Sequence, residues 1–358
     1  MRERVIIITP SGHTPNHQSE RDMMAGFTVN VISEKEDKRI PISVAGQVMV
    51  DVQDLFRHIG EYLISRELRL QEAVPSKLAD KFTLYVDKSE GVVLESSSYT
   101  PETSGYGNVV DDAVKLLEIT LDTLGSGTGA YWVEDNFKDA LYRNQVIIDI
   151  VALYQDLYDK PGFALMYGSG SELKRFGQVN VQKMSNFISD RGLSVNSVTI
   201  GSIENVGNRA GDSRFTLNTG ENRVKLTFSD PKIANGHQGG ASIVAGKINY
   251  NDEGRIASVE NVYEISPLTE IKFRRIISSS GDVSLNVPVD AEVSFKDGKW
   301  TLTNKNLGIL SSKQRWDDAV TDFHDYFIFL WSEYKDKSDD SLSEDEKEVK
   351  DALNALAA

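Results

Sequence analysis

The sequence predicts an α+β fold in three parts. In the first 192 residues, helical periods of i, i+3, i+4 and i+7 mix with short apolar strands, without a regular βαβ rhythm. From Ser194 to Thr303 one strand pattern follows another, with turn signals between them and no helical period. We therefore expect a mixed domain over residues 1–192, a central antiparallel β-barrel or sandwich over 193–287, and a β-hairpin with helices over 288–358.

The elements of the first domain are short strands and amphipathic helices. The clearest helix begins near Ser43, where an apolar face runs from Val48 to Leu63 and the opposite face carries charged residues. The other expected elements are the strands Val5–Thr9 and Thr28–Ile32, a hairpin over Phe82–Glu95, the helices Val110–Leu124 and Phe137–Tyr158, the strand Phe163–Tyr167, and a helix over Asn180–Asp190.

The central domain is predicted by closely spaced strands. Glycine-containing turns such as Asn218-Thr219-Gly220 separate them, and strands at this spacing are typical of a sandwich or a small barrel. The expected strands are Ser197–Ile203, Arg214–Asn218, Arg223–Ser229, Ala241–Tyr250, Ile256–Ile265 and Glu270–Ile276.

The third part begins with a hairpin, Val289–Phe295 and Lys299–Leu302, and continues as an aromatic helix from Gln314. The apolar arc of this helix is wide, because Ile328 and Phe329 lie off the main stripe, so we expect a helix buried on two sides. The stripe, which we expect to be buried against the rest of the protein or a second copy of the chain, includes Trp316, Phe323, Phe327 and Trp331. The last helix begins at Ser343, with Glu346 completing a capping box.

The composition limits the classes of function. A net charge of −15 and a pI near 4.9 repel phosphates and anionic membranes and favour a basic partner. The absence of cysteine excludes disulfides, thiolate metal sites and cysteine nucleophiles. With no signal-peptide pattern and no apolar run of about 20 residues, we expect a cytoplasmic protein that does not enter a membrane.

No motif predicts catalytic residues or a cofactor. The glycine-rich segment Gly125–Gly129 lacks the Lys-Ser/Thr pair of a phosphate-binding loop, and we expect it to be an interhelical linker. His13 and His17 are four residues apart with carboxylates nearby, which makes a metal-dependent enzyme one alternative. Pro15 lies between them, so they belong to a loop with no fixed geometry.

A ligand site on the barrel is a second alternative. His237 lies in a glycine-rich loop that we place at the barrel mouth, and Lys272, Arg274 and Arg275 form a basic cluster around Phe273. Basic and aromatic residues on a barrel face can bind single-stranded nucleic acid or a small ligand. The short cluster and the negative charge of the whole chain argue against nucleic acid.

The C-terminal segment is acidic. Its exposed carboxylates are expected at Asp339, Asp340, Glu344, Asp345 and Glu348. Such residues form either a solvated helix face or a docking surface for a basic protein.

The last fifth of the chain resembles a known family. A strand over Val289–Phe295 is followed by the Trp300 strand, then Leu307-Gly308-Ile309, and then a helix that opens with Trp316-Asp317-Asp318-Ala319. This order resembles the β-β-β-α unit of HicB-type antitoxins, a reduced RNase H-like fold, although Lys313-Gln314 replaces the family's usual glycine-threonine. The resemblance implies a role without catalysis, in which the protein binds and neutralises a protein partner.

Our leading interpretation is therefore a cytoplasmic prokaryotic interaction protein that is antitoxin-like or part of a defence or stress operon. It would bind a basic protein partner. The apolar helix Trp316–Trp331 offers an alternative interface between two copies of the chain.

Overall fold

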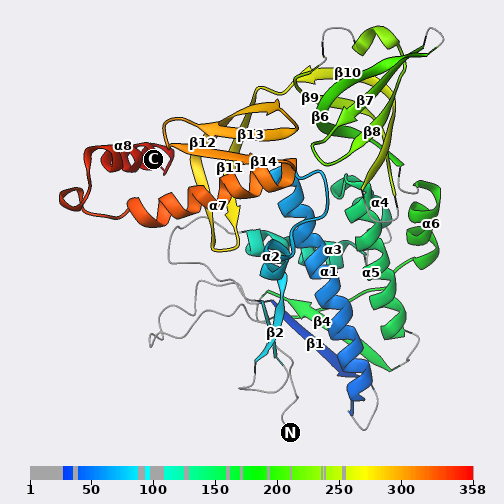
Figure 1. Ribbon diagram of the computed structural model, residues 1–358. Coiled ribbons are helices and arrows are strands. Elements are labelled where there is room, and N and C mark those ends of the chain that lie inside the picture. Colours follow the sequence, from blue (N-terminus) through cyan, green and yellow to red (C-terminus); the bar gives the residue numbers. More distant parts are fainter. Residues whose placement is uncertain are drawn as a thin grey trace. The chain divides into compact units, whose positions relative to one another are not determined.

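The computed structural model describes residues 27–34, 39–87, 93–96, 109–124, 129–158, 162–169, 172–191, 194–209, 212–234, 237, 239–251 and 255–357. Helices and strands are both abundant, so the α+β class is confirmed (Figure 1). The chain divides into two compact units. Unit 1 contains residues 1–63, 75–102 and 107–192, and unit 2 contains residues 64–74, 103–106 and 193–358.

Unit 1 combines an antiparallel sheet, in the order β1-β4-β5, with a separate hairpin, β2-β3, and helices. Its strands are β1 (Thr28–Ser33), β2 (Leu84–Asp87), β3 (Val93–Ser96), β4 (Phe163–Gly168) and β5 (Lys174–Arg175). Its helices are α1 (Ile42–Leu68, whose last turn belongs to unit 2), α2 (Ser76–Ala79), η1 (Asp80–Phe82), α3 (Val109–Leu124), α4 (Gly129–Asn136), α5 (Ala140–Tyr158) and α6 (Val181–Arg191).

Most of the expected elements of unit 1 are present. The apolar face of α1 from Val48 to Leu63 is buried, as its period predicts. The helix expected over Phe137–Tyr158 begins later, at Ala140, because Asp139 accepts the backbone N–H of Leu141 at 2.8 Å and caps it. The strand expected at Val5–Thr9 lies outside the described residues.

Unit 2 contains a closed barrel of five strands. These are β6 (Ser194–Arg209), β7 (Asp212–Asn218), β8 (Arg223–Phe228), β9 (Ala241–Tyr250) and β10 (Ile256–Pro267), with the short helix η2 (Pro231–Ala234) between β8 and β9. The strand order β10-β8-β7-β6-β9 closes where β9 pairs with β10. The barrel is therefore confirmed, but it is not fully antiparallel, because β8 and β10 run parallel. An odd number of strands cannot alternate in direction all the way round a closed ring.

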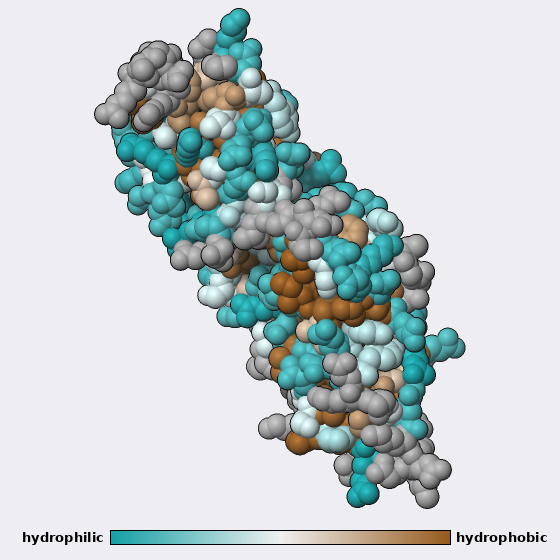
Figure 2. Space-filling model, turned by 90° about the vertical axis from the view of Figure 1, so that its right-hand side faces the viewer, coloured by the Kyte–Doolittle hydropathy of each residue, from teal (hydrophilic) through white to brown (hydrophobic). Residues whose placement is uncertain are grey.

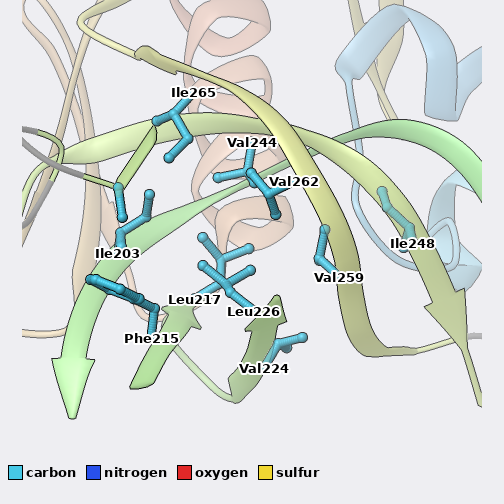
Figure 3. Packing of buried hydrophobic residues seen from close by; sticks show 11 residues of the cluster. Ile203, Phe215, Leu217, Val224, Leu226, Val244, Ile248, Val259, Val262 and Ile265 are labelled. Carbon is cyan, nitrogen blue, oxygen red and sulfur yellow. The ribbon is translucent and has the colours of Figure 1, made fainter. Parts of the chain in front are cut away.

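Apolar side chains fill the interior of this barrel (Figure 3). On β7 and β8 the inward residues alternate with outward ones, and Phe215, Leu217, Val224 and Leu226 are buried. The strands β9 and β10 contribute residues such as Val244 to the same core. A ligand of this barrel would therefore bind on its outside.

The rest of unit 2 is a four-stranded antiparallel sheet in the order β11-β12-β13-β14. Its strands are β11 (Glu270–Ser278), β12 (Gly281–Lys296), β13 (Lys299–Asn304) and β14 (Ile309–Lys313). The strand expected over Glu270–Ile276 therefore does not belong to the barrel, because a tight turn after Ser278 pairs it with β12. β12 also runs through residue 288, where we expected a domain boundary.

Two helices cover parts of this sheet. α7 (Trp316–Tyr334) contacts all four strands through the expected stripe, which is buried within the chain itself: Trp316, Phe323, Phe327 and Trp331. The stripe therefore offers no surface to a second copy of the chain. η3 (Asp339–Ser341) leads to α8 (Glu344–Ala357), which packs on β12.

The start of α8 confirms the expected capping box. Glu346 Oε2 accepts the N–H of Ser343 at 2.7 Å, and Ser343 Oγ accepts the N–H of Glu346 at 3.4 Å. At the other end, Asn286 Nδ2 donates to the carbonyl of Ala357 at 2.7 Å, and Leu353 is fully buried. α8 is therefore capped at its start and bonded to β12 at its end.

The surface is mixed. Figure 2 shows one face, where hydrophilic residues surround smaller apolar areas. Among the helices of the described ranges, none has the length and apolar character needed to cross a bilayer.

Candidate functional site

The metal site expected at His13 and His17 lies outside the described residues. Within the part of the chain that the structure describes, no group of three or more His, Asp or Glu side chains is arranged to hold a metal ion.

The ligand residues expected on the barrel do not share one sheet. His237 follows η2 beside the barrel, and its N–H donates to the carbonyl of Ala234 at 3.4 Å. Lys272, Arg274 and Arg275 instead lie on β11 of the four-stranded sheet. The separation arises because the chain leaves the barrel at Pro267, before the basic cluster begins.

The basic cluster has a structural explanation, since β11 is an edge strand. Charged side chains on an edge strand oppose pairing with another chain. Lys272 is exposed and binds Glu270 at 2.9 Å, and this hydrogen bond raises the pKa of the lysine. The backbone N–H of Ile277 is satisfied by Nδ1 of the buried His324, at 3.0 Å. The charges of this cluster are therefore suited to protecting the edge of the sheet.

The five acidic residues expected to bind a partner are all exposed, on η3 and in the first turns of α8: Asp339, Asp340, Glu344, Asp345 and Glu348. Two of them form ion pairs. Asp339 binds Lys350 at 2.6 Å, which lowers the pKa of the aspartate, and Glu344 binds Lys347 at 2.8 Å. Because α8 packs on β12 and is bonded to it at Asn286, the carboxylates of its first turns project from a packed helix.

A second acidic surface, which sequence reasoning missed, lies on the outward face of α7. We call it the α7 ridge; it consists of Asp318, Asp322, Asp325, Tyr326, Phe329 and Glu333. At 100° per residue these side chains fall within one narrow arc, opposite the buried stripe. No lysine or arginine occurs between Trp316 and Tyr334. The ridge is therefore acidic along its whole length.

Two aromatic rings lie within the α7 ridge. Tyr326 and Phe329 are 45% and 51% exposed, and their rings stack with centroids 6.0 Å apart. The wide apolar arc predicted burial on two sides, but only Ile328 follows that prediction, at 7% exposed. The position of Phe329 off the main stripe was the feature of the sequence that could have predicted an exposed ring. Its exposure depends on how α7 is rotated on the sheet, which the sequence does not specify.

Cations already interact with this helix. Lys313 binds Asp322 at 2.9 Å, and Lys337 binds Glu333 at 2.8 Å. At the end of α7, Nζ of Lys335 lies 4.2 Å from the centroid of the Trp331 ring. Carboxylates beside exposed rings are suited to arginine, whose planar guanidinium can stack on an aromatic face while it binds a carboxylate.

A different polar cluster lies in unit 1 between α1 and α5. We call it the carboxylate layer; it consists of Asp51, Asp54 and His58 from α1 and Asp149 and Asp156 from α5. Nδ1 of His58 is 2.6 Å from Oδ2 of Asp149. Further bonds come from neighbouring glutamines: Gln47 donates to Asp51 at 3.0 Å, and Gln145 donates to Asp149 at 3.2 Å.

The pKa values in the layer are shifted. Burial raises the pKa of Asp51 to about 6, and the nearby Asp156 adds to the effect. Burial and the charge of Asp149 raise the pKa of Asp54. Burial opposes protonation of His58, but the hydrogen bond and the charge of Asp149 outweigh it and raise the pKa of the imidazole. Mild acid therefore adds protons to this layer before it affects ordinary carboxylates.

Part of the carboxylate layer could be predicted from the spacing of its residues in the sequence. Asp51, Asp54 and His58 are spaced i, i+3 and i+7 on one face of α1, and Asp149 and Asp156 are seven residues apart on α5. We expected a charged face on α1, opposite its apolar face, but identified no partner for it. The structure instead pairs it with a polar face more than 90 residues later.

No family model, no curated protein and no solved structure matches the chain.

Proposed function

We propose that this protein is a non-enzymatic interaction module that binds a basic protein partner through the acidic surfaces of its C-terminal part. The observation that carries the proposal is the α7 ridge, where Tyr326 and Phe329 are exposed and stacked among carboxylates on a helix without basic residues. Five exposed acids on η3 and α8 extend the negative surface.

Charge acts on a partner at long range, and aromatic contacts act at short range. A net charge of −15 attracts a basic partner and raises the rate of encounter, more strongly at low salt. At contact, a few residues supply most of the binding energy of a protein interface, and tyrosine is enriched among them. The opposite face of α7 is packed on the sheet, so Tyr326 and Phe329 are presented with little loss of conformational entropy on binding.

The resemblance to HicB-type antitoxins supports the same proposal. The elements β12, β13, β14 and α7 follow one another in the order of the antitoxin β-β-β-α unit. An antitoxin-like role, in a defence or stress operon, would make the partner a basic protein that this chain neutralises. Asp317, in the acidic turn of the motif, is buried, so the partner would contact the outward residues from Asp318 onward.

A second function is favoured by the barrel. Its five strands, its short helix between the third and fourth strands and its parallel pairing of the third and fifth match the strand order of oligonucleotide- and oligosaccharide-binding barrels. Residues 194–267 carry seven Lys and Arg against eight Asp and Glu, so the barrel is nearly neutral in an acidic chain. A shared strand order does not specify a ligand, which is why this function ranks second.

Peptide binding tests the leading function. We expect a fluorescein-labelled peptide of nine arginines to bind the full chain, measured by fluorescence anisotropy at low salt. A nine-lysine peptide should bind more weakly, because its ammonium groups do not stack on rings as guanidinium does. Replacing Tyr326 and Phe329 together by alanine should weaken binding of the arginine peptide about tenfold.

The matched control is Tyr263→Ala, since Tyr263 is 55% exposed on β10 and lies outside the α7 ridge. This variant should bind the arginine peptide as the wild type does. Equal binding by all three proteins would contradict a role for the ridge. A labelled single-stranded DNA that binds more tightly than either peptide would favour the barrel function instead.

A further inference from the structure

The carboxylate layer contains two pairs of side chains, each of which connects the antiparallel helices α1 and α5. We call each pair a rung. Asp51 of α1 lies against Asp156 of α5. Seven residues later on α1 and seven residues earlier on α5, His58 lies against Asp149. Figure 1 shows α1 and α5 side by side over this length. Each rung therefore joins the same two helices and changes charge with pH.

The first rung brings two carboxyl groups together. Among the residues that the structure describes, none donates a hydrogen bond to Oδ2 of Asp51, although the residue is only 6% exposed. Two neighbouring carboxylates repel each other when both are charged. When one of them is protonated it becomes a donor, and a hydrogen bond between Asp51 and Asp156 can form. A proton therefore converts this rung from repulsive to attractive.

The second rung uses histidine. A protonated His58 is a charged donor to Asp149, whereas a neutral imidazole keeps the hydrogen bond but loses the ionic attraction. Loss of that proton also leaves Asp54 and Asp149 facing each other without a neighbouring positive charge from the imidazole. Both rungs hold the two helices more tightly when protonated.

We propose that the α1–α5 pair is a proton-operated latch, which holds unit 1 closed in mild acid and loosens it as the pH rises. Within the described ranges, the other charged groups that act on Asp54 and His58 are Arg57 and Glu61 of α1. Arg57 binds Glu61 at 2.9 Å, so its positive charge is largely offset, and from α5 the neutral Gln145 contacts Asp149. The layer therefore remains dominated by carboxylates.

The pKa shifts determine whether the stability of unit 1 rises or falls with pH. The pKa of Asp51 is about 6 in the folded chain against 3.8 for an ordinary aspartate, so the folded state holds an extra proton between these values. Stability from this group is present at low pH and is lost as the pH rises through about 4 to 6. The pKa of His58 lies above its ordinary value of 6.5, so its contribution is lost as the pH rises beyond that value. Both groups therefore stabilise unit 1 more at low pH than at high pH.

Unit 2 contains shifted groups of its own, among them His324 and Asp317, so the readout must resolve individual residues. Full burial lowers the pKa of His324 to about 3, and stability from this group is lost as the pH falls below 6.5. A melting curve of the whole chain would mix the two trends. Hydrogen–deuterium exchange, corrected for the intrinsic effect of pH, reports α1 and α5 separately from α7.

We expect the protection of α1 and α5 amides in the wild type to fall by tenfold or more between pH 5 and pH 8. Asp51→Asn should remove much of this dependence and raise protection at pH 8, by up to about 100-fold, because asparagine stays neutral. His58→Gln should flatten the change above pH 6.5. The control Asp135→Asn changes an exposed carboxylate on α4 and should leave the profile unchanged.

The carboxyl carbon of Asp51, followed by NMR in the wild-type chain, gives a test that needs no variant. We expect its chemical shift to titrate near pH 6. A midpoint near pH 4, or an Asp51→Asn chain whose α1 and α5 amides keep the wild-type pH dependence, would overturn the proposal.

Discussion

At the scale of the residue, position in space changes what an acidic side chain does. Asp317 and Asp318 are adjacent in an acidic turn, yet Asp317 is 4% exposed and Asp318 is exposed on the ridge. The carboxylate of Asp317 accepts the N–H groups of Gln71 and Glu72 at 2.8 and 2.9 Å. Burial raises its pKa to about 6, even though these two hydrogen bonds favour the charged form. No local pattern predicts this, because the accepted amides lie almost 250 residues earlier.

Replacing each of these two aspartates by alanine tests how much the buried carboxylate contributes to stability. Asp317→Ala should lower the free energy of unfolding of unit 2 by about 2–3 kcal/mol, because two backbone donors would lose their acceptor. Asp318→Ala should change it by less than about 0.5 kcal/mol, since the residue is at the surface. Urea unfolding at pH 7 measures both. Equal effects of the two variants would show that the hydrogen bonds to Gln71 and Glu72 do not stabilise the fold.

At the scale of the element, strong periodicity predicted which helices and strands exist, but it did not predict which strands pair with each other. The face of α1 from Val48 to Leu63, the β12–β13 hairpin and the capping box at Ser343 are all present as expected. The partner of β11 was predicted wrongly, because an alternating pattern fixes which side chains face inward but not which strand lies alongside. The short turn after Ser278 places β11 beside β12, and a turn signal in the sequence does not specify which sheet a strand joins.

The turn between β7 and β8 is an element whose role depends on a distant segment. Gly220 has a φ of +104°, and an added Cβ would lie 1.8 Å from the backbone oxygen of Gln314. Trp300 Nε1 donates to the carbonyl of Thr219 in the same turn at 2.8 Å. A side chain at Gly220 would therefore strain the backbone and also force the turn away from the segment before α7.

Gly220→Ala should lower the melting temperature of unit 2 considerably more than Gly298→Ala. Both glycines have positive φ, which costs alanine about 1–2 kcal/mol, but nothing lies within 4 Å of a Cβ added at Gly298. Calorimetry of the two variants measures the difference. If both melt at the same temperature, the turn can move away from Gln314 without cost.

At the scale of the whole molecule, composition was informative about surfaces but not about sites. The five acidic residues expected at the surface are exposed: Asp339, Asp340, Glu344, Asp345 and Glu348. The α7 ridge was missed because its two aromatics depend on the rotation of one helix. The carboxylate layer was missed because its two polar faces meet only in the folded chain. The basic residues of β11 were assigned to a barrel that ends before them.

Copurification from native lysate at low salt tests the central claim that the α7 ridge binds a basic protein. The wild-type chain and the Tyr263→Ala control should recover the same basic protein, identified by mass spectrometry. The chain with both Tyr326 and Phe329 replaced by alanine should lose it, and added salt should weaken recovery by the wild type. Recovery of this chain alone, or of the same partner by the ridge variant, would contradict the account.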